Sequence, residues 1–328
     1  MKKRILITGG AGFIGYFLAS SFAEENYNVV ILDNFVRGKK DQLLNELISK
    51  HDVQILNVNC MDFHSVMEIN KDFDYIVHLA AIIGVKHVNS NPYSVLENNI
   101  LMLNNIIKFS NAQKNLSRLL FASTSEVYSG TLENFGMQIP TPEDTPLTIN
   151  SLDRRRTSYM LSKIYGEAMC IQSGLPYTIF RPHNIYGPRM GMSHVIPEQL
   201  KKAYETNDGE IVSIASAEHS RCFCFIDDAI EMLKRIIINE SCVNKILNLG
   251  VESPEISIEK LIKLCWKVVG KEFIIKKEGN TVGSPMRRAP NMKKTTNLIG
   301  HFRETDLENG IKKTYDWYLS NVFKAKVY

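Results

Sequence analysis

The stretch ILITGGAGFIG, residues 5–15, decides the fold. Its first three residues are apolar, its glycines follow the spacing G-x-x-G-x-x-G, and an amphipathic helical pattern continues from it. Between a strand and a helix, Gly9 permits a tight turn, Gly12 lets a pyrophosphate approach the backbone, and Gly15 permits close packing of the helix. The helix N-terminus then offers free N–H groups to phosphates. The stretch therefore predicts a dinucleotide-binding turn, with cofactor contacts at Gly9, Gly12, Phe13, Ile14 and Gly15.

An acidic residue at the end of the next apolar run distinguishes NAD from NADP. This β-branched run ends at Asp33, about twenty residues after the glycines, and Asn34 follows it. A carboxylate at this place accepts hydrogen bonds from the adenosine ribose hydroxyls and repels a 2′-phosphate. NAD is therefore the predicted cofactor, with contacts at Asp33 and Asn34. Arg37 lies close enough in the sequence to leave NADP open.

Short apolar runs alternate with helical patterns through the first half of the chain, which predicts an α/β fold with a Rossmann-type, doubly wound parallel sheet. Strands are expected at 4–8, 28–33, 54–57, 75–79, 119–123 and 177–181, and helices at 13–25, 95–110 and 158–172. Beyond Gly187 the alternation fades, which predicts a smaller, mixed α/β C-terminal part. The expected division is a dinucleotide-binding domain at 1–186 and a substrate domain at 187–328, with a strand at 245–249 rejoining the main sheet.

The bulk properties are those of an ordinary soluble globular protein. Of 328 residues, 44% are hydrophobic and 23% are charged, and the net charge of +4 arises from 39 basic and 35 acidic residues. The basic residues are scattered, so nucleic acid is not an expected partner. Six cysteines show neither metal-binding nor disulfide spacing, so no metal is expected and the thiols are expected to be reduced. No segment resembles a signal peptide or a membrane span, and the cytoplasm is the expected compartment.

A tyrosine and a lysine stand four residues apart in the predicted helix 158–172. Tyr159 and Lys163 thus share one helix face, where the ammonium can lower the pKa of the phenol and bind the nicotinamide ribose. A tyrosine tuned in this way can take the proton of a sugar hydroxyl while hydride leaves for the cofactor. The strand 119–123 leads into Thr124, whose hydroxyl can share the hydrogen bond to the substrate. Together these residues predict hydride transfer at a sugar carbon.

Seven motifs in this order resemble those of the extended short-chain dehydrogenase/reductases that act as NAD-dependent nucleotide-sugar epimerases, dehydratases and decarboxylases. The resemblance spans nearly the whole chain. The motifs are the glycine turn, HLAA at 78–81, TSEVY at 124–128, Tyr159 to Lys163, RPHNIYGPR at 181–189, RCFCFIDD at 221–228 and RRAP at 287–290. The resemblance implies an enzyme that acts on a nucleotide-diphosphate sugar. It also implies a homodimer, with helices 95–110 and 158–172 pairing across the interface as a four-helix bundle.

The resemblance further implies roles for individual residues. Thr124, Tyr159 and Lys163 are expected to be catalytic, and the last two also to contact the cofactor. Asp62 is expected to contact the adenine. Further cofactor contacts are expected at Leu79, Ala80, Ala81 and Asn99, and substrate contacts at Asn184, Arg221 and Arg288.

Three reactions remain open after oxidation of the sugar at C4. In this family the ketone permits three second steps. Return of hydride to the other face gives a 4-epimer, and loss of the C6 hydroxyl gives a 4-keto-6-deoxy sugar. The third step is loss of carbon dioxide from a C6 carboxylate. Glu126 favours the second and third reactions, because simple 4-epimerases usually carry small residues at this place. The spacing of Arg156 and Tyr159 and the segments 186–190 and 221–223 resemble those of UDP-glucuronate decarboxylases. Decarboxylation is therefore the favoured interpretation.

Glu126 is therefore expected to be catalytic, and Arg221 or the run Arg154 to Arg156 to meet a C6 carboxylate. A 4-epimerase and a 4,6-dehydratase are the alternatives. A binding protein without catalysis and a dehydrogenase that releases NADH are further possibilities, both less favoured because Thr124, Tyr159 and Lys163 are intact.

The chain departs from the family at three places. Met102 and Leu103 stand where the family usually has Gly-Thr, Tyr16 replaces a small serine, and Ser129 is inserted before Gly130. These changes bear on the packing beside the active-site strand and on the substrate, and not on the cofactor.

Overall fold

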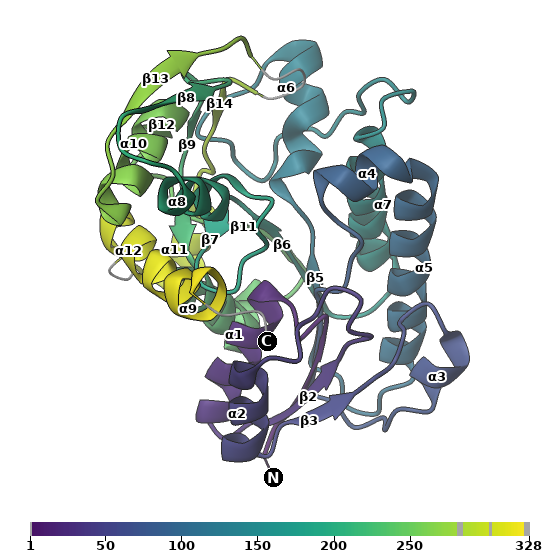
Figure 1. The fold of residues 1–328 in the computed structure, drawn as a ribbon. Coiled ribbons are helices and arrows are strands. Elements are labelled where there is room, and N and C mark those ends of the chain that lie inside the picture. Colours follow the sequence, from purple (N-terminus) through teal and green to yellow (C-terminus); the bar gives the residue numbers. More distant parts are fainter. Residues whose placement is uncertain (1, 281–284, 302–303, 325–328) are drawn as a thin grey trace.

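A seven-stranded parallel sheet forms the centre of the computed structural model, which describes residues 2–280, 285–301 and 304–324 (Figure 1). The strand order is β11-β6-β5-β4-β1-β2-β3. The bounds are β1 (Arg4–Thr8), β2 (Asn28–Leu32), β3 (Gln54–Leu56), β4 (Tyr75–His78), β5 (Arg118–Ala122), β6 (Tyr177–Pro182) and β11 (Lys245–Leu249). The predicted strands are confirmed to within one residue at either end.

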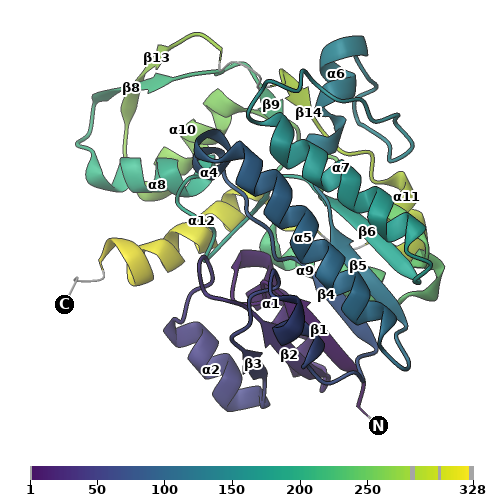
Figure 2. The same cartoon turned by 90° about the vertical axis from the view of Figure 1, so that its right-hand side faces the viewer.

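Helices cover both faces of this sheet, as Figures 1 and 2 show from two sides. One face carries α1 (Phe13–Glu24), α2 (Gln42–His51) and α9 (Ile226–Ile238), and the other carries α3 (Phe63–Met67), α5 (Pro92–Asn111) and α7 (Thr157–Gln172). The helix α5 begins three residues earlier than expected because Pro92, which lacks a backbone N–H, occupies its first turn. The predicted Rossmann-type, doubly wound α/β fold is confirmed.

The apolar character of the central strands follows from this double cover. In β1 the side chains of Ile5 and Ile7 pack into one hydrophobic cluster, and Leu6 between them packs into the other. All three are fully buried. A strand with helices on both faces must be apolar at every position, which is why it reads as a continuous run and not as an alternation.

The strand order also fixes where a ligand can bind. Strand β1 has β2 on one side and β4 on the other, so the connections that leave β1 and β4 diverge to opposite faces of the sheet. In open α/β sheets, ligands occupy the crevice beyond the carboxyl ends of the strands at this switch point. The glycine turn 9–15 follows β1 directly and lies at that crevice.

The smaller C-terminal part combines short strands with helices, in the upper left of Figure 1. Its small sheets have the orders β10-β7, β12-β9-β14 and β13-β8. Their strands are β7 (Ile185–Tyr186), β8 (Glu210–Ile214), β9 (Ser220–Arg221), β10 (Cys224–Phe225), β12 (Ile256–Ser257), β13 (Phe273–Lys277) and β14 (Arg287–Arg288). The helices are α8 (Val195–Glu205), α10 (Ile258–Val269), α11 (Lys293–Ile299) and α12 (Leu307–Tyr318). After α9 the chain returns to the main sheet as β11, which pairs with β6 in parallel, and then continues with β12 and α10.

Two short helices, which the sequence patterns did not predict, pack on neighbouring elements: the first on α5 and the second on the turn after β5. They are α4 (Val85–Ser90) and α6 (Ser129–Phe135), and α6 follows the 3₁₀ turn η1 (Ser125–Tyr128). The inserted Ser129 begins α6, and a side chain at Gly130 would collide with the backbone of Thr148, so α6 packs tightly on the 145–150 loop. Within the described part of the chain, no helix combines the length and apolarity needed to span a membrane. The six cysteines are buried and unbonded.

Candidate active site

The glycine turn forms a cradle that only glycines permit. Gly9 has φ +69°, and a Cβ there would lie 2.9 Å from the backbone nitrogen of Ala80. A side chain at Gly15 would collide with the backbone of Gly9 and Gly10. At Gly12, by contrast, the Cβ position meets only the Gly9 carbonyl oxygen, at 3.1 Å, so the backbone at the α1 N-terminus stands open. These residues fit a dinucleotide pyrophosphate.

A cavity of about 430 Å³ extends from this turn to the end of β5. Most residues predicted to contact the cofactor line it. They are Gly9, Gly12, Phe13, Ile14, Gly15, Asp33, Asn34, Leu79, Ala80, Ala81, Tyr159 and Lys163, together with Thr124. The cavity is also lined by residues that the sequence patterns did not single out as contacts, among them Arg37, Val58, Met61, Ile82, Met102, Arg189 and His194. Met102, a departure from the family, thus belongs to the cavity wall.

Asp33 is held firmly at one end of the cavity. Its carboxylate accepts hydrogen bonds from the backbone N–H groups of Ala11, at 3.0 Å, and Phe35, at 2.8 Å. The side chain is 7% exposed. The carboxylate therefore stands at the glycine turn in a fixed orientation, where the family resemblance places the adenosine ribose.

Two predicted cofactor residues do not line the cavity. Asp62 is exposed and caps α3 by accepting hydrogen bonds from the backbone of His64 and Ser65 and from the Ser65 hydroxyl. The Ser65 hydroxyl, first, and these backbone groups lower the pKa of Asp62. Asn99 is buried and holds the backbone of Ile82, accepting from its N–H at 2.7 Å and donating to its carbonyl at 3.1 Å. Asn99 thus fixes the backbone of Ile82, a residue of the cavity wall, without lining the cavity itself.

The predicted catalytic residues come together at the other end of the cavity. Helix α7 carries Tyr159 and Lys163, and Thr124 precedes η1 at the end of β5. The Lys163 ammonium donates to the Ala122 carbonyl at 2.8 Å and lies 4.8 Å from the centre of the Phe121 ring. Burial lowers the pKa of Lys163 to about 8.

The expectation that Lys163 lowers the pKa of Tyr159 is not met in this structure. Burial, first, and the Glu126 carboxylate, second, raise the pKa of Tyr159 well above its ordinary value. A hydrogen bond with Thr124 and the charge of Arg37 act in the opposite direction. Desolvation of a phenol inside the protein is the largest influence on this pKa, and Lys163 is not among its main causes.

A buried ion pair that the sequence patterns missed holds α7 against the strands. Arg181 in β6 donates to both carboxylate oxygens of Glu167 in α7, at 2.9 and 2.7 Å. The Ser123 hydroxyl donates to the same carboxylate, and Arg181 also donates to the Tyr128 hydroxyl at 2.7 Å. The one sequence signal was the position of Glu167, four residues after Lys163 on the same helix face. This cluster fixes the helix that carries Tyr159.

A second glutamate, Glu126, lies among arginines. Its carboxylate is 2.9 Å from the Arg288 guanidinium and 3.3 Å from that of Arg156. Arg221 and Arg288 are paired on the adjacent strands β9 and β14. Burial would raise the pKa of Glu126, but Arg288, Arg156 and Arg221 together hold it below its ordinary value. The carboxylate is therefore ionised at neutral pH among three guanidinium groups.

Arg221 and Asn184 occupy defined places beside this cluster. The Arg221 guanidinium donates to the carbonyls of Pro285, at 2.6 Å, and Ser220, at 2.7 Å, and burial, followed by Arg288, lowers its pKa to about 10. The Asn184 amide donates to the Cys222 carbonyl at 2.9 Å. Arg221 thus acts on Glu126 through its charge, whereas Arg288 and Arg156 contact the Glu126 carboxylate directly.

The basic run 154–156 divides into three different contacts. Arg154 pairs with Glu133 in α6, Arg155 donates to the Asn89 carbonyl in α4, and Arg156 reaches Glu126. Only the last of these residues belongs to the arginine cluster.

Arg189 links the C-terminal part to the glycine turn through hydrogen bonds and an ion pair. It donates to both carboxylate oxygens of Asp41, at 2.8 and 2.9 Å, and to the Gly12 carbonyl at 3.3 Å. Its guanidinium also lies 4.2 Å from the centre of the Tyr16 ring. Tyr16, the second departure from the family, therefore packs against the Arg189 side chain that makes this link.

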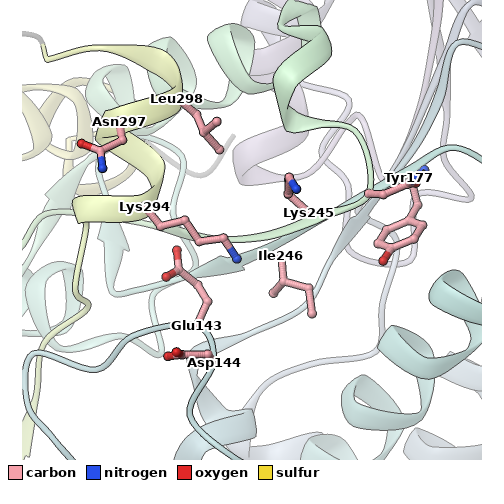
Figure 3. Close-up of a pocket in the computed structure, with 9 residues that line it drawn as sticks. Glu143, Asp144, Tyr177, Lys245, Ile246, Lys294, Asn297 and Leu298 are labelled. Atoms are coloured by element: carbon pink, nitrogen blue, oxygen red, sulfur yellow. Dashed lines mark hydrogen bonds between the residues drawn. The ribbon is translucent and has the colours of Figure 1, made fainter.

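Another cavity, of about 570 Å³, lies at the outer edge of β11 (Figure 3). It is lined by Glu143, Asp144, Tyr177, Asn244, Lys245, Ile246, Lys294, Asn297 and Leu298. Figure 3 shows Glu143 and Lys294, from two separate segments, converging on it. Since no predicted site residue lines this cavity, the candidate active site is the one between the glycine turn and Tyr159.

Comparison with known proteins identifies the family of the chain. Residues 5–250 match the model of the NAD dependent epimerase/dehydratase family. The UDP-N-acetyl-alpha-D-glucosaminuronate decarboxylase of Bacillus cytotoxicus is 32% identical over 97% of this chain and 98% of that protein. The UDP-glucuronic acid decarboxylase 1 of Xenopus tropicalis is 30% identical over 97% of this chain and 72% of that protein.

Solved structures share the fold at lower identity. An epimerase of Methanothermobacter thermautotrophicus superposes with a TM-score of 0.84 at 21% identity, over 98% of this chain and 93% of that one. The UDP-glucuronic acid 4-epimerase of Bacillus cereus, solved with UDP-glucuronic acid and NAD, has a TM-score of 0.79 at 23% identity, over 97% and 99% of the two chains.

Proposed function

The chain belongs to the NAD dependent epimerase/dehydratase family and is an NAD-dependent enzyme of nucleotide sugars, and from this premise we propose that it removes the C6 carboxylate of a nucleotide-linked hexuronic acid. The observation that carries the proposal is the arginine cluster around Glu126, at the same end of the site as Tyr159.

The first step oxidises the sugar at C4. Tyr159 takes the proton of the C4 hydroxyl as a phenolate, Thr124 shares the hydrogen bond to that oxygen, and Lys163, one helical turn along, binds the nicotinamide ribose. Burial and Glu126 oppose formation of this phenolate, and the positive charge of the nicotinamide ring would favour it once NAD is bound. NAD, when bound, supplies the acceptor for the hydride from C4. The Thr124 hydroxyl, which acts to lower the pKa of Tyr159, and the common helix of Tyr159 and Lys163 support these roles.

The second step removes carbon dioxide. With a ketone at C4, the C6 carboxylate belongs to a β-keto acid, so the C5–C6 bond breaks and its electron pair passes to the C4 oxygen as an enolate. Carbon dioxide leaves and C5 takes a proton. The hydride then returns to C4 while the C4 oxygen regains the proton that Tyr159 took, so the reaction has no net oxidation.

The charges in the cluster suit this step. Three guanidinium groups act on the Glu126 carboxylate, and Glu255, which also acts on Arg221, is paired with Arg287. This leaves positive charge for the anionic groups of the substrate, its carboxylate and its diphosphate. Glu126, which stays ionised, repels a substrate carboxylate beside it, and this repulsion ends when the group leaves as neutral carbon dioxide. Arg288 and Arg221 are accordingly proposed to hold the anionic groups, and Asn184 to contact the substrate.

The relatives support a UDP-linked substrate but differ at C2 of the sugar. One of the two similar decarboxylases is named for an N-acetylglucosaminuronate and the other for glucuronate. We propose that one of these two compounds is the substrate, and the test includes both.

The test is product analysis with purified enzyme and no added NAD. UDP-glucuronate and UDP-N-acetylglucosaminuronate are each incubated with the enzyme, carbon dioxide is measured, and the nucleotide sugar is analysed by mass spectrometry. Loss of carbon dioxide from either supports the proposal. No change in mass with an inverted C4 identifies a 4-epimerase, and loss of water from a UDP-, GDP-, CDP- or dTDP-hexose identifies a dehydratase. Either result overturns decarboxylation. A Tyr159→Phe variant should form no product from any of them.

We also propose a homodimer formed through α5 and α7. These two helices pack side by side and leave apolar side chains exposed: Tyr93, Leu101, Tyr165 and Ile171. A second copy presenting the same face would cover them as a four-helix bundle. Sedimentation at micromolar concentration tests this state, and a monomer would exclude it.

The domain boundaries and the compartment follow as proposals from the same chain. Parallel pairing of β11 with β6 supports a dinucleotide-binding domain of residues 1–186 completed by residues 245–249, with the rest of 187–328 as the substrate domain. Six free cysteines, all buried, are compatible with a reducing compartment, and we propose the cytoplasm.

A further inference from the structure

The strand β11 carries one polar side chain, Asn248, into the interior of the protein. Its two neighbours in the strand, Leu247 and Leu249, pack into the hydrophobic core. Asn248 itself is fully buried and lies beside Arg181 of β6 in the parallel register. A buried amide is unfavourable unless its polar atoms are hydrogen-bonded. The hydrogen-bond partners of Asn248 therefore indicate why a polar residue occupies this position.

The side-chain amide of Asn248 joins four segments that are distant in the sequence. Its Nδ2 donates to the carbonyls of Thr141, at 3.0 Å, and Asn291, at 3.1 Å. Its Oδ1 accepts from the Tyr128 hydroxyl, at 3.0 Å, and lies 3.1 Å from Nε2 of His183. A reversed amide would place its oxygen against two carbonyl oxygens, so these contacts fix its orientation.

Two of these segments carry the ion pair between Glu126 and Arg288. Glu126 and Tyr128 both belong to the turn η1. Arg288 lies three residues before Asn291. The Asn291 N–H also donates to the Thr141 carbonyl at 2.9 Å, so Nδ2 bonds to two segments that are already joined to each other. Each member of the ion pair is therefore close in the chain to a hydrogen bond with the same amide.

The partners of Oδ1 keep one protonation state at neutral pH. Burial, first, and the charge of Arg288, second, lower the pKa of His183 to about 3, so the imidazole is neutral. Because the amide oxygen of Asn248 only accepts, the ring carries its hydrogen on Nε2. Burial raises the pKa of the Tyr128 hydroxyl to about 12, so this group keeps the hydrogen that it donates. The amide is thus held in a single arrangement.

We propose that Asn248 is a positioning residue for the substrate, whose side-chain amide sets Arg288 against Glu126. The proposal rests on the assignment of Glu126 and Arg288 to the sugar substrate, and not on the reaction that follows oxidation at C4. A guanidinium is ordered only if the backbone that carries it is ordered, and a displacement of about 1 Å can lower turnover by up to about 100-fold. The amide fixes the backbone on both sides of the ion pair.

The test is a double-mutant cycle between Asn248 and Arg288. Turnover is measured for Asn248→Ala, Arg288→Lys and the double variant, with the nucleotide sugar that gives product in the assay above, whichever reaction that product reveals. The matched control is Asn105→Ala. Asn105 is also buried, and its amide donates to two backbone carbonyls, those of Cys60 and Met61, each at 3.0 Å. These two residues line the cofactor cavity.

We expect Asn248→Ala and Arg288→Lys each to lower turnover by about tenfold. The double variant should lose much less than the roughly hundredfold product, because both changes disturb the same guanidinium. Asn105→Ala combined with Arg288→Lys should instead lose the product of its two single effects. A full product in the first cycle would overturn the proposal, and so would an equal shortfall in the control cycle.

Two further measurements separate position from folding. Melting temperatures show whether each variant is folded, and Asn248→Ser, which retains a hydroxyl, replaces Asn248→Ala if the alanine variant is not. Affinity for NAD, measured by calorimetry, should stay within about twofold of the wild type. A loss of NAD affinity as large as the loss of turnover would contradict the proposal. A crystal structure of the variant needs no substrate, and it should show Arg288 displaced from Glu126. The unchanged contact at 2.9 Å would exclude the positioning role.

Discussion

Two glutamate–arginine pairs form hydrogen bonds with the two serines that flank Thr124, and the two pairs differ in burial and in charge balance. Ser123 donates to Glu167, which is paired with Arg181, and these two side chains are 4% and 2% exposed. Ser125 accepts a hydrogen bond from Arg288, which is paired with Glu126, and here 14% and 25% are exposed.

The difference separates a pair that holds the structure from a pair that is open to a ligand. In the Glu167–Arg181 pair each carboxylate oxygen is bonded, and the remaining donor of Arg181 is used by Tyr128 and a backbone carbonyl. Its charges cancel. In the Glu126 cluster, three arginines face one carboxylate. An excess of positive charge in a partly exposed cluster suits the anionic ligand proposed above, whereas a closed and balanced pair needs none.

The largest expected effect is on the closed pair. Glu167→Gln leaves the Arg181 charge buried without compensation, and we expect the free energy of unfolding to fall by about 3–5 kcal/mol. Urea unfolding measures this. The control is Glu133→Gln, which breaks the exposed pair with Arg154 and should cost less than about 1 kcal/mol. If Glu167→Gln costs no more than the control, the distinction between the two pairs fails.

The open pair should respond in activity and not in stability. Glu126→Gln keeps the shape of the side chain but removes the charge that orders Arg288 and Arg156, and we expect turnover to fall on the order of 10²–10³-fold, as when a preorganised electrostatic group is lost. The melting temperature should stay near that of the wild type. A lower melting temperature with unchanged turnover of the folded fraction would assign Glu126 a structural role.

The two arginines at Glu126 should differ from each other. Arg288→Lys keeps the charge but loses the planar fork that contacts Glu126 and Ser125, and we expect turnover to fall about tenfold. Arg156 is 44% exposed and lies farther from Glu126, so Arg156→Lys should change turnover by less than about threefold. Steady-state kinetics measures both. A larger effect at Arg156 would reverse the assignment of the main partner.

The smallest expected effect is the pH dependence of NAD affinity. It depends on Lys163, whose pKa is influenced by Glu167 of the closed pair. Burial lowers the pKa of Lys163 to about 8, while Cys170 and then Glu167 act to raise it. The ammonium is thus present below pH 8 and lost above it, so affinity for NAD should fall by about half at pH 8 relative to pH 7.

Stability should move in the opposite direction. The unfolded chain binds the Lys163 proton up to a higher pH than the folded one does, so this residue adds stability as pH rises above 8. In Glu167→Gln the midpoint of the affinity loss should shift below pH 8, because a carboxylate that supports the ammonium is gone. An unchanged midpoint would show that the closed pair has no electrostatic influence on the site.

The parts of this molecule that could be predicted from sequence are those fixed by neighbouring residues. The glycine turn, the apolar strands and the helix with Tyr159 and Lys163 each depend on a short segment, and the structure has them where they were expected. Contacts between distant segments were harder. Glu126 and Arg288 were both candidates, but their direct contact joins residues 162 positions apart in the chain.

Two kinds of residue were beyond the sequence patterns. Glu167 and Arg181 look like an ordinary helix-surface acid and a strand-end base, and only burial on both sides reveals their pairing. Asp62 and Asn99 were expected at the cofactor by resemblance, and their side chains instead hold backbone groups. A side chain that caps a helix or orders a loop is not distinguishable in sequence from one that faces a ligand.

The return of the chain to the main sheet as β11 limits how this protein can be divided. A fragment ending at residue 186 would leave the edge of β6 without its neighbour, and Ile179 and Phe180 in that strand are fully buried in the intact chain. Such an uncovered apolar edge favours aggregation. A graft of a different sugar-binding half onto this protein would therefore have to retain residues 245–249, which requires three junctions, after residues 186, 244 and 249, and not one.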